Sequence, residues 1–166
     1  IYELSLLWLI ISFHLLSSIF QFAAEFVEKY EYYDKVRRGI NPLRFIEYSI
    51  TATLMLICSA LVSGISDFIV LCAIASFTFT TMILGMIAEL LFDDKITEGG
   101  GYVRPIGCGV HCSGWLTIMS AYGIILFHFF GSNANSSNTA PGWVVVAMWV
   151  VFALYIGFGI IQFFQL

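Results

Sequence analysis

Charged residues are scarce in this sequence. Of its 166 residues, 11% are charged and 60% are hydrophobic, and the mean hydropathy is +0.91. A soluble domain of this size would have to expose much of that apolar surface to water, so the composition excludes one. The net charge is −4, and the charges cluster between apolar runs instead of forming a field that attracts nucleic acid. The composition predicts an integral membrane protein that lies in a lipid bilayer and does not bind nucleic acid.

Catalytic motifs are absent as well. The sequence contains no H-E-x-x-H motif, no nucleophile elbow and no phosphate-binding loop. The glycines of "EGGGY" (98–102) are followed by no lysine and preceded by no strand. The carboxylates are too scattered along the chain to form a catalytic pair. We therefore expect no enzymatic activity.

The sequence has only four cysteines. Cys58 and Cys72 lie in apolar runs, where they most simply fill space. Cys108 and Cys112 flank His111 in "GCGVHC". This cluster supplies at most three ligands for a soft metal, and no fourth ligand is evident. We expect a turn where the chain enters the membrane, and no metal site.

Five apolar runs are long enough to cross a membrane as helices, which takes about 20 residues each. The predicted fold is therefore all-α: a single transmembrane domain over residues 1–166, built as a five-helix bundle. Polar segments separate the runs, among them the tight "SGISD" turn (63–67) and the Asn/Ser-rich "GSNANSSNTAPG" (131–142). The predicted spans are 4–28, 43–65, 67–91, 113–131 and 142–166.

The basic residues predict the orientation of these spans. All seven lysines and arginines fall in the first and third connections or at their rims, and the other two connections contain none. Because cytoplasmic loops carry an excess of Lys and Arg, we expect connections 29–44 and 92–112 to be cytoplasmic. The start of the chain, the "SGISD" turn and the Asn/Ser-rich segment then face outward.

Glu47 is the first candidate functional residue. It lies in "NPLRFIEYSITATLML" (41–56), where Asn41 is the predicted N-cap and Pro42 the first helical residue. A carboxylate within a spanning helix costs about 2.5–3.5 kcal/mol, so something should compensate it. Two explanations remain open. Either Arg44, three residues earlier, and the helix N-terminus stabilise it, or Glu47 faces the bundle interior and neutralises a buried cation.

His14 lies deep in the first span, in "LIISFHLLSS" (9–18). A buried imidazole needs a hydrogen-bond partner, and three nearby serines could supply one. It is either a packed, satisfied histidine or a functional group. Counting helical rise places it about 10 Å nearer the outside than Glu47, so we expect no direct bond between the two. The three serines are Ser12, Ser17 and Ser18.

Aromatic residues recur along the last span. Trp149, Phe152 and Tyr155 follow one another at near-helical spacing. Such a stripe is typical of packing between membrane helices, and it also suits a pocket for a long conjugated ligand. Gln162, further along the same span, is a polar group that needs a partner.

The segment "NPLRFIEYSITATLM" resembles the third helix of heliorhodopsins, microbial-type retinal proteins with inverted membrane orientation. "SFHLLSS" is similar to their second helix, "SGISDFIVLCAIASFTFTTMILG" to the following turn and fourth helix, and "APGWVVVAMW" to the sixth. The resemblance covers almost the whole chain, as helices two to six, and implies part of a seven-helix rhodopsin fold. The orientation derived from the basic residues agrees with it.

The resemblance also implies a function, a retinal-binding light sensor. By resemblance, Glu47 matches the counterion of the protonated retinal Schiff base, and Thr51, Met55 and Trp149 would lie along the chromophore. His14 matches the histidine of the polar network near the Schiff base. Ile10 departs from the family, which often has a serine at that position, one turn before the histidine.

The family attaches retinal to a lysine of its seventh helix, and the three lysines here are all predicted at membrane edges. The chain begins at Ile1 and stops at Leu166 inside an apolar run, so we expect it to be part of a longer protein that supplies this lysine. Retinal is expected only on that condition. The alternative is a pigment-free structural subunit of a larger membrane complex. A homodimer is also left open.

Overall fold

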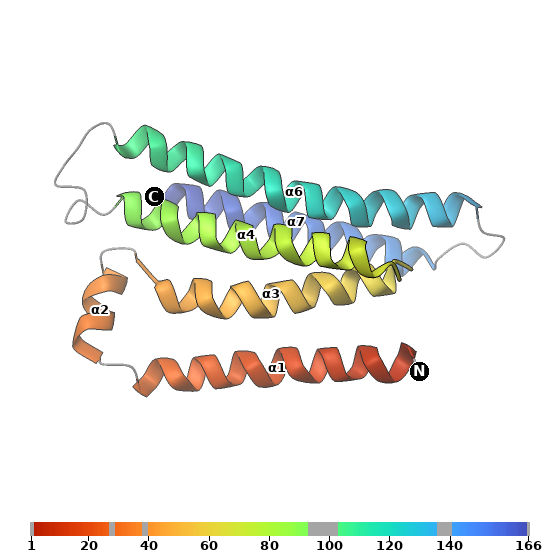
Figure 1. The fold of residues 1–166 in the computed structure, drawn as a ribbon, viewed down its shortest axis with the longest axis horizontal. Helices are drawn as coiled ribbons and strands as arrows, with labels where there is room; N and C mark the ends of the chain where they lie inside the picture. Colours follow the sequence, from red (N-terminus) through yellow and green to blue (C-terminus); the bar gives the residue numbers. More distant parts are fainter. Residues whose placement is uncertain (1, 27–28, 38–39, 93–102, 136–140, 166) are drawn as a thin grey trace.

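The computed structural model describes residues 2–26, 29–37, 40–92, 103–135 and 141–165. Five of the helices in these residues are long and apolar enough to cross a membrane, and α2 is not. The five run side by side along the longest dimension of the molecule, and α2 lies across one end (Figure 1). The predicted all-α membrane bundle is confirmed. Its helices are α1 (Tyr2–Phe26), α2 (Lys29–Arg37), α3 (Pro42–Val62), α4 (Phe68–Phe92), α6 (Val103–Asn135) and α7 (Gly142–Gln165).

The two ends of the bundle differ in the segments they hold. The end of α1, α2, the start of α3, the end of α4 and the start of α6 lie together at one end (Figure 1). This end carries the described residues of connections 29–44 and 92–112, as the orientation prediction requires. Which side of the membrane it faces stays a prediction.

Local chemistry sets both ends of α3. The side chain of Asn41 accepts a hydrogen bond from the backbone N–H of Arg44 at 3.1 Å, and Pro42 opens the helix, both as predicted. At the far end, Gly64 adopts a φ of 89°, a left-handed conformation that residues with a Cβ rarely adopt. Asp67 then accepts a hydrogen bond from the N–H of Val70 at 3.0 Å as α4 begins. These contacts explain how five residues suffice to reverse the chain.

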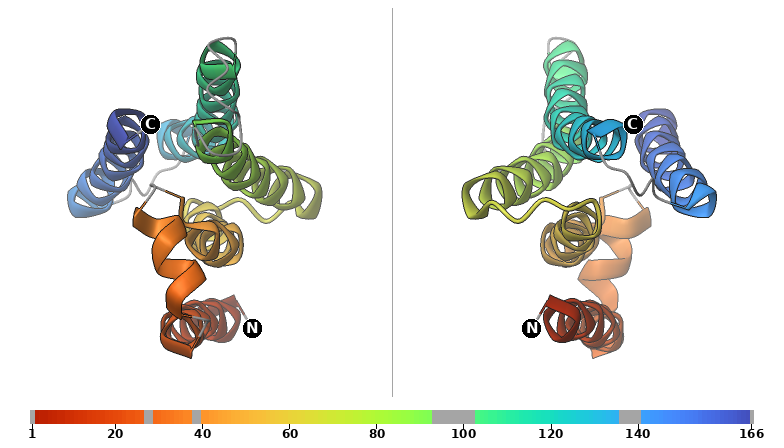
Figure 2. Two further views of the ribbon diagram at one scale, coloured as in Figure 1. Left: turned by 90° about the vertical axis from the view of Figure 1, so that its left-hand side faces the viewer. Right: turned by 90° about the vertical axis from the view of Figure 1, so that its right-hand side faces the viewer.

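The buried core lies among α3, α4, α6 and α7. Views along the bundle show these four helices grouped together, with α1 beyond α3 at the edge (Figure 2). α4 and α6 form the most extensively packed pair. Thr81 and Thr117 join them through a hydroxyl–hydroxyl hydrogen bond of 2.7 Å. The core residues are Leu56, Ala60, Ile65, Ile74, Ile118, Ala121, Tyr122, Ile125, Phe129 and Met148.

The predicted start of the fourth span, residue 113, is wrong. α6 begins at Val103, so "GCGVHC" is helical and is not a turn. Pro105 is tolerated because it lies in the first turn, where its missing N–H has no intrahelical partner. Gly107 packs so closely on Phe92 that a Cβ would lie 2.6 Å from its ring, and this contact favours helix despite the glycines. The helices that contain the other four predicted spans begin and end within three residues of the predicted bounds.

Candidate functional site

A cavity of about 380 Å³ lies between α1, α3 and α7. Its volume falls within the range of about 300–1,000 Å³ that is common for ligand pockets. The surface of its lining is mostly apolar, and among the described residues Glu47 is the only carboxylate that lines it. The lining residues are Phe13, Ser17 and Gln21 from α1, Glu47, Tyr48, Thr51, Ala52 and Met55 from α3, Met82 from α4, and Leu154, Tyr155 and Phe158 from α7.

Glu47 reaches this cavity from the second turn of α3. The hydroxyl of Ser17 on α1 donates a hydrogen bond to Oε1 of Glu47 at 2.6 Å. Thr51 is buried one turn later, and its hydroxyl donates to the backbone carbonyl of Glu47 at 3.0 Å. A hydroxyl therefore stabilises this carboxylate, which lines the cavity. Such a group can neutralise a cation bound in the cavity.

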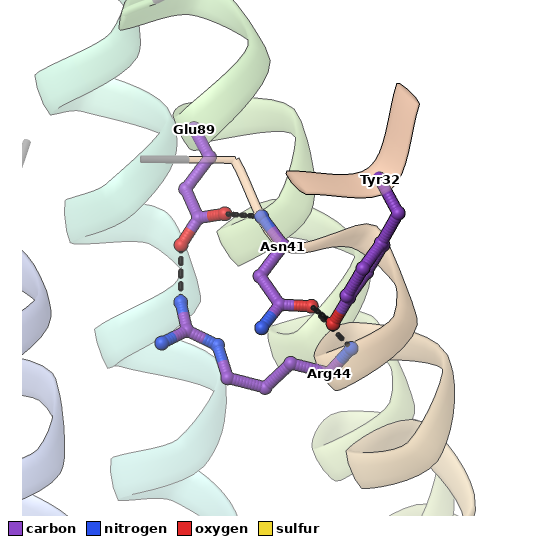
Figure 3. Close-up of polar contacts among 4 residues, drawn as sticks. All are labelled: Tyr32, Asn41, Arg44 and Glu89. Carbon is purple, nitrogen blue, oxygen red and sulfur yellow. Dashed lines mark hydrogen bonds and ion pairs between the residues drawn. The ribbon is translucent and has the colours of Figure 1, made fainter. Parts of the chain in front are cut away.

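Arg44 is not the partner of Glu47, so the Arg44 part of the first explanation is wrong, whereas stabilisation by the helix N-terminus stays a prediction. Arg44 forms an ion pair with Glu89 of α4 instead (Figure 3). Residues three apart on a helix are neighbours but leave its axis in different directions. Arg44 leaves α3 toward α4, whereas Glu47 leaves it toward α1. The pairing was decided by the neighbouring helices.

Glu89 is a residue that the sequence reasoning missed. It is 5% exposed, and its Oε2 accepts a hydrogen bond from the backbone N–H of Asn41 at 3.1 Å. Asn41 in turn accepts one from the hydroxyl of Tyr32 on α2 at 3.2 Å (Figure 3). The sequence did contain a signal for it, because Glu89 lies inside an apolar span, where any carboxylate is a candidate functional residue.

The five predicted site residues are not all brought together. Glu47, Thr51 and Met55 line the cavity. His14 and Trp149 are not among the lining residues, and both side chains are exposed in this chain. None of the apolar span of α1 is buried against the other described helices, so the depth of His14 in the membrane stays a prediction. That His14 and Trp149 act near the chromophore stays a prediction.

A second, smaller cavity of about 40 Å³ adjoins the first and shares Met82, Tyr155 and Phe158 with it. Here the indole N–H of Trp115 donates to Nε2 of buried His111 at 3.1 Å. Gln162, for which the sequence required a partner, is buried, and its Nε2 has none within the described part of the chain.

Metal binding finds no support in the described ranges. Cys108, His111 and Cys112 share one helix, α6, and His111 is already bonded to Trp115. Across residues 2–26, 29–37, 40–92, 103–135 and 141–165, no group of three or more His, Cys, Asp or Glu side chains could hold a metal ion.

Comparisons with known proteins add one match. A family model described as Heliorhodopsin matches residues 1–166. No curated protein and no solved structure matches the chain.

Proposed function

This chain belongs to the heliorhodopsin family, and from that premise we propose that the full-length protein binds retinal and senses light, with Glu47 as the counterion of the protonated Schiff base. Bound retinal would supply the visible absorption. The chain is a multi-pass integral membrane protein with a rhodopsin-like bundle. The observation that carries the proposal is that, among the described residues, Glu47 is the one carboxylate lining a mostly apolar cavity of about 380 Å³.

The cavity suits an elongated, apolar, cationic ligand. Phe13, Met82 and Phe158 supply apolar walls, and Thr51 and Met55 extend the lining along α3 from Glu47. A buried cation needs an opposite charge close by. Glu47 supplies that charge, and the hydroxyl of Ser17 orients its carboxylate. We propose a binding role for these residues and no catalytic activity.

The lysine that joins retinal is not expected from the spans seen here. The sequence contains Lys29, Lys35 and Lys95. The first two belong to α2, which does not span the membrane, and Lys95 lies outside the described residues. We therefore propose that the lysine comes from a segment outside these 166 residues. The lysine-free spans are also what favours the alternative, a pigment-free subunit of a larger membrane complex.

Reconstitution with retinal separates these two functions. Purified full-length protein incubated with all-trans retinal should develop a visible absorption band. Glu47→Gln should shift this band, or move the pH midpoint at which the band is lost, because the charge that stabilises the bound cation is gone. Asp67→Asn is a matched control, since it removes a carboxylate from the exposed turn before α4 and leaves a side chain that can still cap that helix.

Two results would contradict the proposal. A full-length protein without any retinal-dependent visible band would favour the pigment-free subunit. A pigment whose band and pH midpoint are the same in wild type and E47Q would remove the counterion role from Glu47.

A further inference from the structure

Arg44 is a potential competitor for the charge of Glu47. The two residues lie three apart near the start of α3, a spacing at which oppositely charged side chains on a helix can pair. If they paired, the guanidinium would occupy the carboxylate on which a bound cation depends. In the structure the two side chains bind different neighbouring helices instead. Glu47 contacts α1, and Arg44 contacts α4.

Glu89 is what holds Arg44 away. Its Oε1 accepts from Nη2 of Arg44, and its Oε2 accepts from the backbone N–H of Asn41 at 3.1 Å. Both oxygens are thus fixed by donors at the start of α3 (Figure 3). The carboxylate is 5% exposed and the Arg44 side chain 23% exposed, so water screens this pair weakly.

The surroundings of Arg44 leave few alternatives to Glu89. Its guanidinium lies 5.0 Å above the ring of Phe45, and its Nε makes no hydrogen bond within the described residues. Without the negative charge of Glu89, Arg44 would be a partly buried cation with no paired anion. The carboxylate of Glu47 is one turn away on the same helix.

We propose that Glu89 is a positioning residue that sequesters Arg44 and so keeps Glu47 available to a cation in the large cavity. This inference rests on the proposed counterion role of Glu47. Glu89 has no contact with the cavity itself and acts through Arg44. The two ion pairs of the site, Arg44 with Glu89 and the bound cation with Glu47, would then be mutually dependent.

The test in the pigment compares three variants of the full-length protein. Glu89→Gln should lower the pH midpoint at which the visible band is lost by about one unit or more, in the same direction as Glu47→Gln, because Arg44 now competes for Glu47. The double variant Arg44→Gln/Glu89→Gln lacks the competitor, so its midpoint and absorption maximum should return to those of wild type. A loss of packing alone would not be repaired by the second substitution.

A second measurement needs no retinal. In the retinal-free protein, Glu47→Gln should lower the unfolding midpoint more in the Glu89→Gln background than in wild type, because Arg44 has then become a partner of Glu47. Such non-additivity is what a double-mutant cycle reports for coupled residues. This cycle tests the inference even if Glu47 is not a counterion.

The outcomes are distinct. If E47Q alters the pigment but E89Q does not, the positioning role is overturned while the counterion role stands. If E47Q leaves the pigment unchanged and the retinal-free cycle still shows coupling, the proposed function fails and the sequestering of Arg44 stands. If E89Q yields no pigment, a wild-type-like pigment in the double variant supports the inference. If the double variant also yields none, Glu89 is needed for folding and the inference is overturned.

Discussion

Gly159 is the position where one added methyl group should damage the bundle most selectively. A Cβ built there would lie 2.6 Å from two ring carbons of Trp115 and 2.8 Å from its Nε1. Real Cβ atoms do not approach other atoms this closely, so the indole would have to move. That indole donates to Nε2 of His111, and His111 and Gly159 line the same small cavity. Gly159→Ala should therefore push α7 away from α6 and break the hydrogen bond between Trp115 and His111.

The magnitude follows from three effects. Overpacking a core by a methyl group typically costs about 1–3 kcal/mol. A lost intramolecular hydrogen bond adds about 0.5–1.5 kcal/mol. Alanine regains up to about 1 kcal/mol over glycine in a helix interior. Together these effects predict that Gly159→Ala lowers the free energy of unfolding by about 0.5–4.5 kcal/mol.

Gly157 offers a matched control in the same helix. A Cβ at this position would meet no atom within 4 Å. Gly157→Ala should therefore leave stability unchanged or raise it by up to about 1 kcal/mol through helix propensity. Unfolding in mixed micelles with increasing dodecyl sulfate, followed by circular dichroism and tryptophan fluorescence, measures both variants. Equal stability of the two would refute the close packing of Trp115 on α7.

Three further predictions concern the membrane topology and the core. After the native cysteines are replaced, a cysteine at Ser66 should be labelled by a membrane-impermeant reagent from outside intact cells and one at Val36 should not; the reverse pattern would invert the orientation. Thr81→Val should lower the free energy of unfolding by roughly 0.6 kcal/mol, up to about 1.7, because it removes the interhelical hydrogen bond to Thr117. In a Thr117→Val background the same substitution should cause no loss of unfolding free energy, and that result would confirm the bond. Tyr122→Phe should be neutral or stabilising in thermal unfolding, because the hydroxyl of Tyr122 is buried and makes no hydrogen bond within the described residues; a loss above about 1 kcal/mol would indicate a bond made through water.

The sequence by itself predicted the class, the five spans and their sequence order. These features are local: hydrophobic runs, the helix start at Asn41–Pro42 and the "SGISD" turn. Their conformations depend on nearby residues of the chain and not on which helices pack beside them. Glu47 could also be identified as a candidate from the sequence, because a carboxylate in an apolar span has a cost that the sequence alone reveals. The exception is α6, which begins at Val103 although glycine propensity disfavours helix there, and whose Gly107 packs closely on Phe92 of α4.

Only the tertiary structure decided which charges and polar groups meet. Two choices of partner, Glu89 for Arg44 and Ser17 for Glu47, could not be read from the sequence. Both choices depend on how α3 is rotated between α1 and α4, which directs Arg44 to one neighbour and Glu47 to the other. That rotation is set by the summed packing of the whole bundle, because each side chain of a helix can reach only the neighbour it faces.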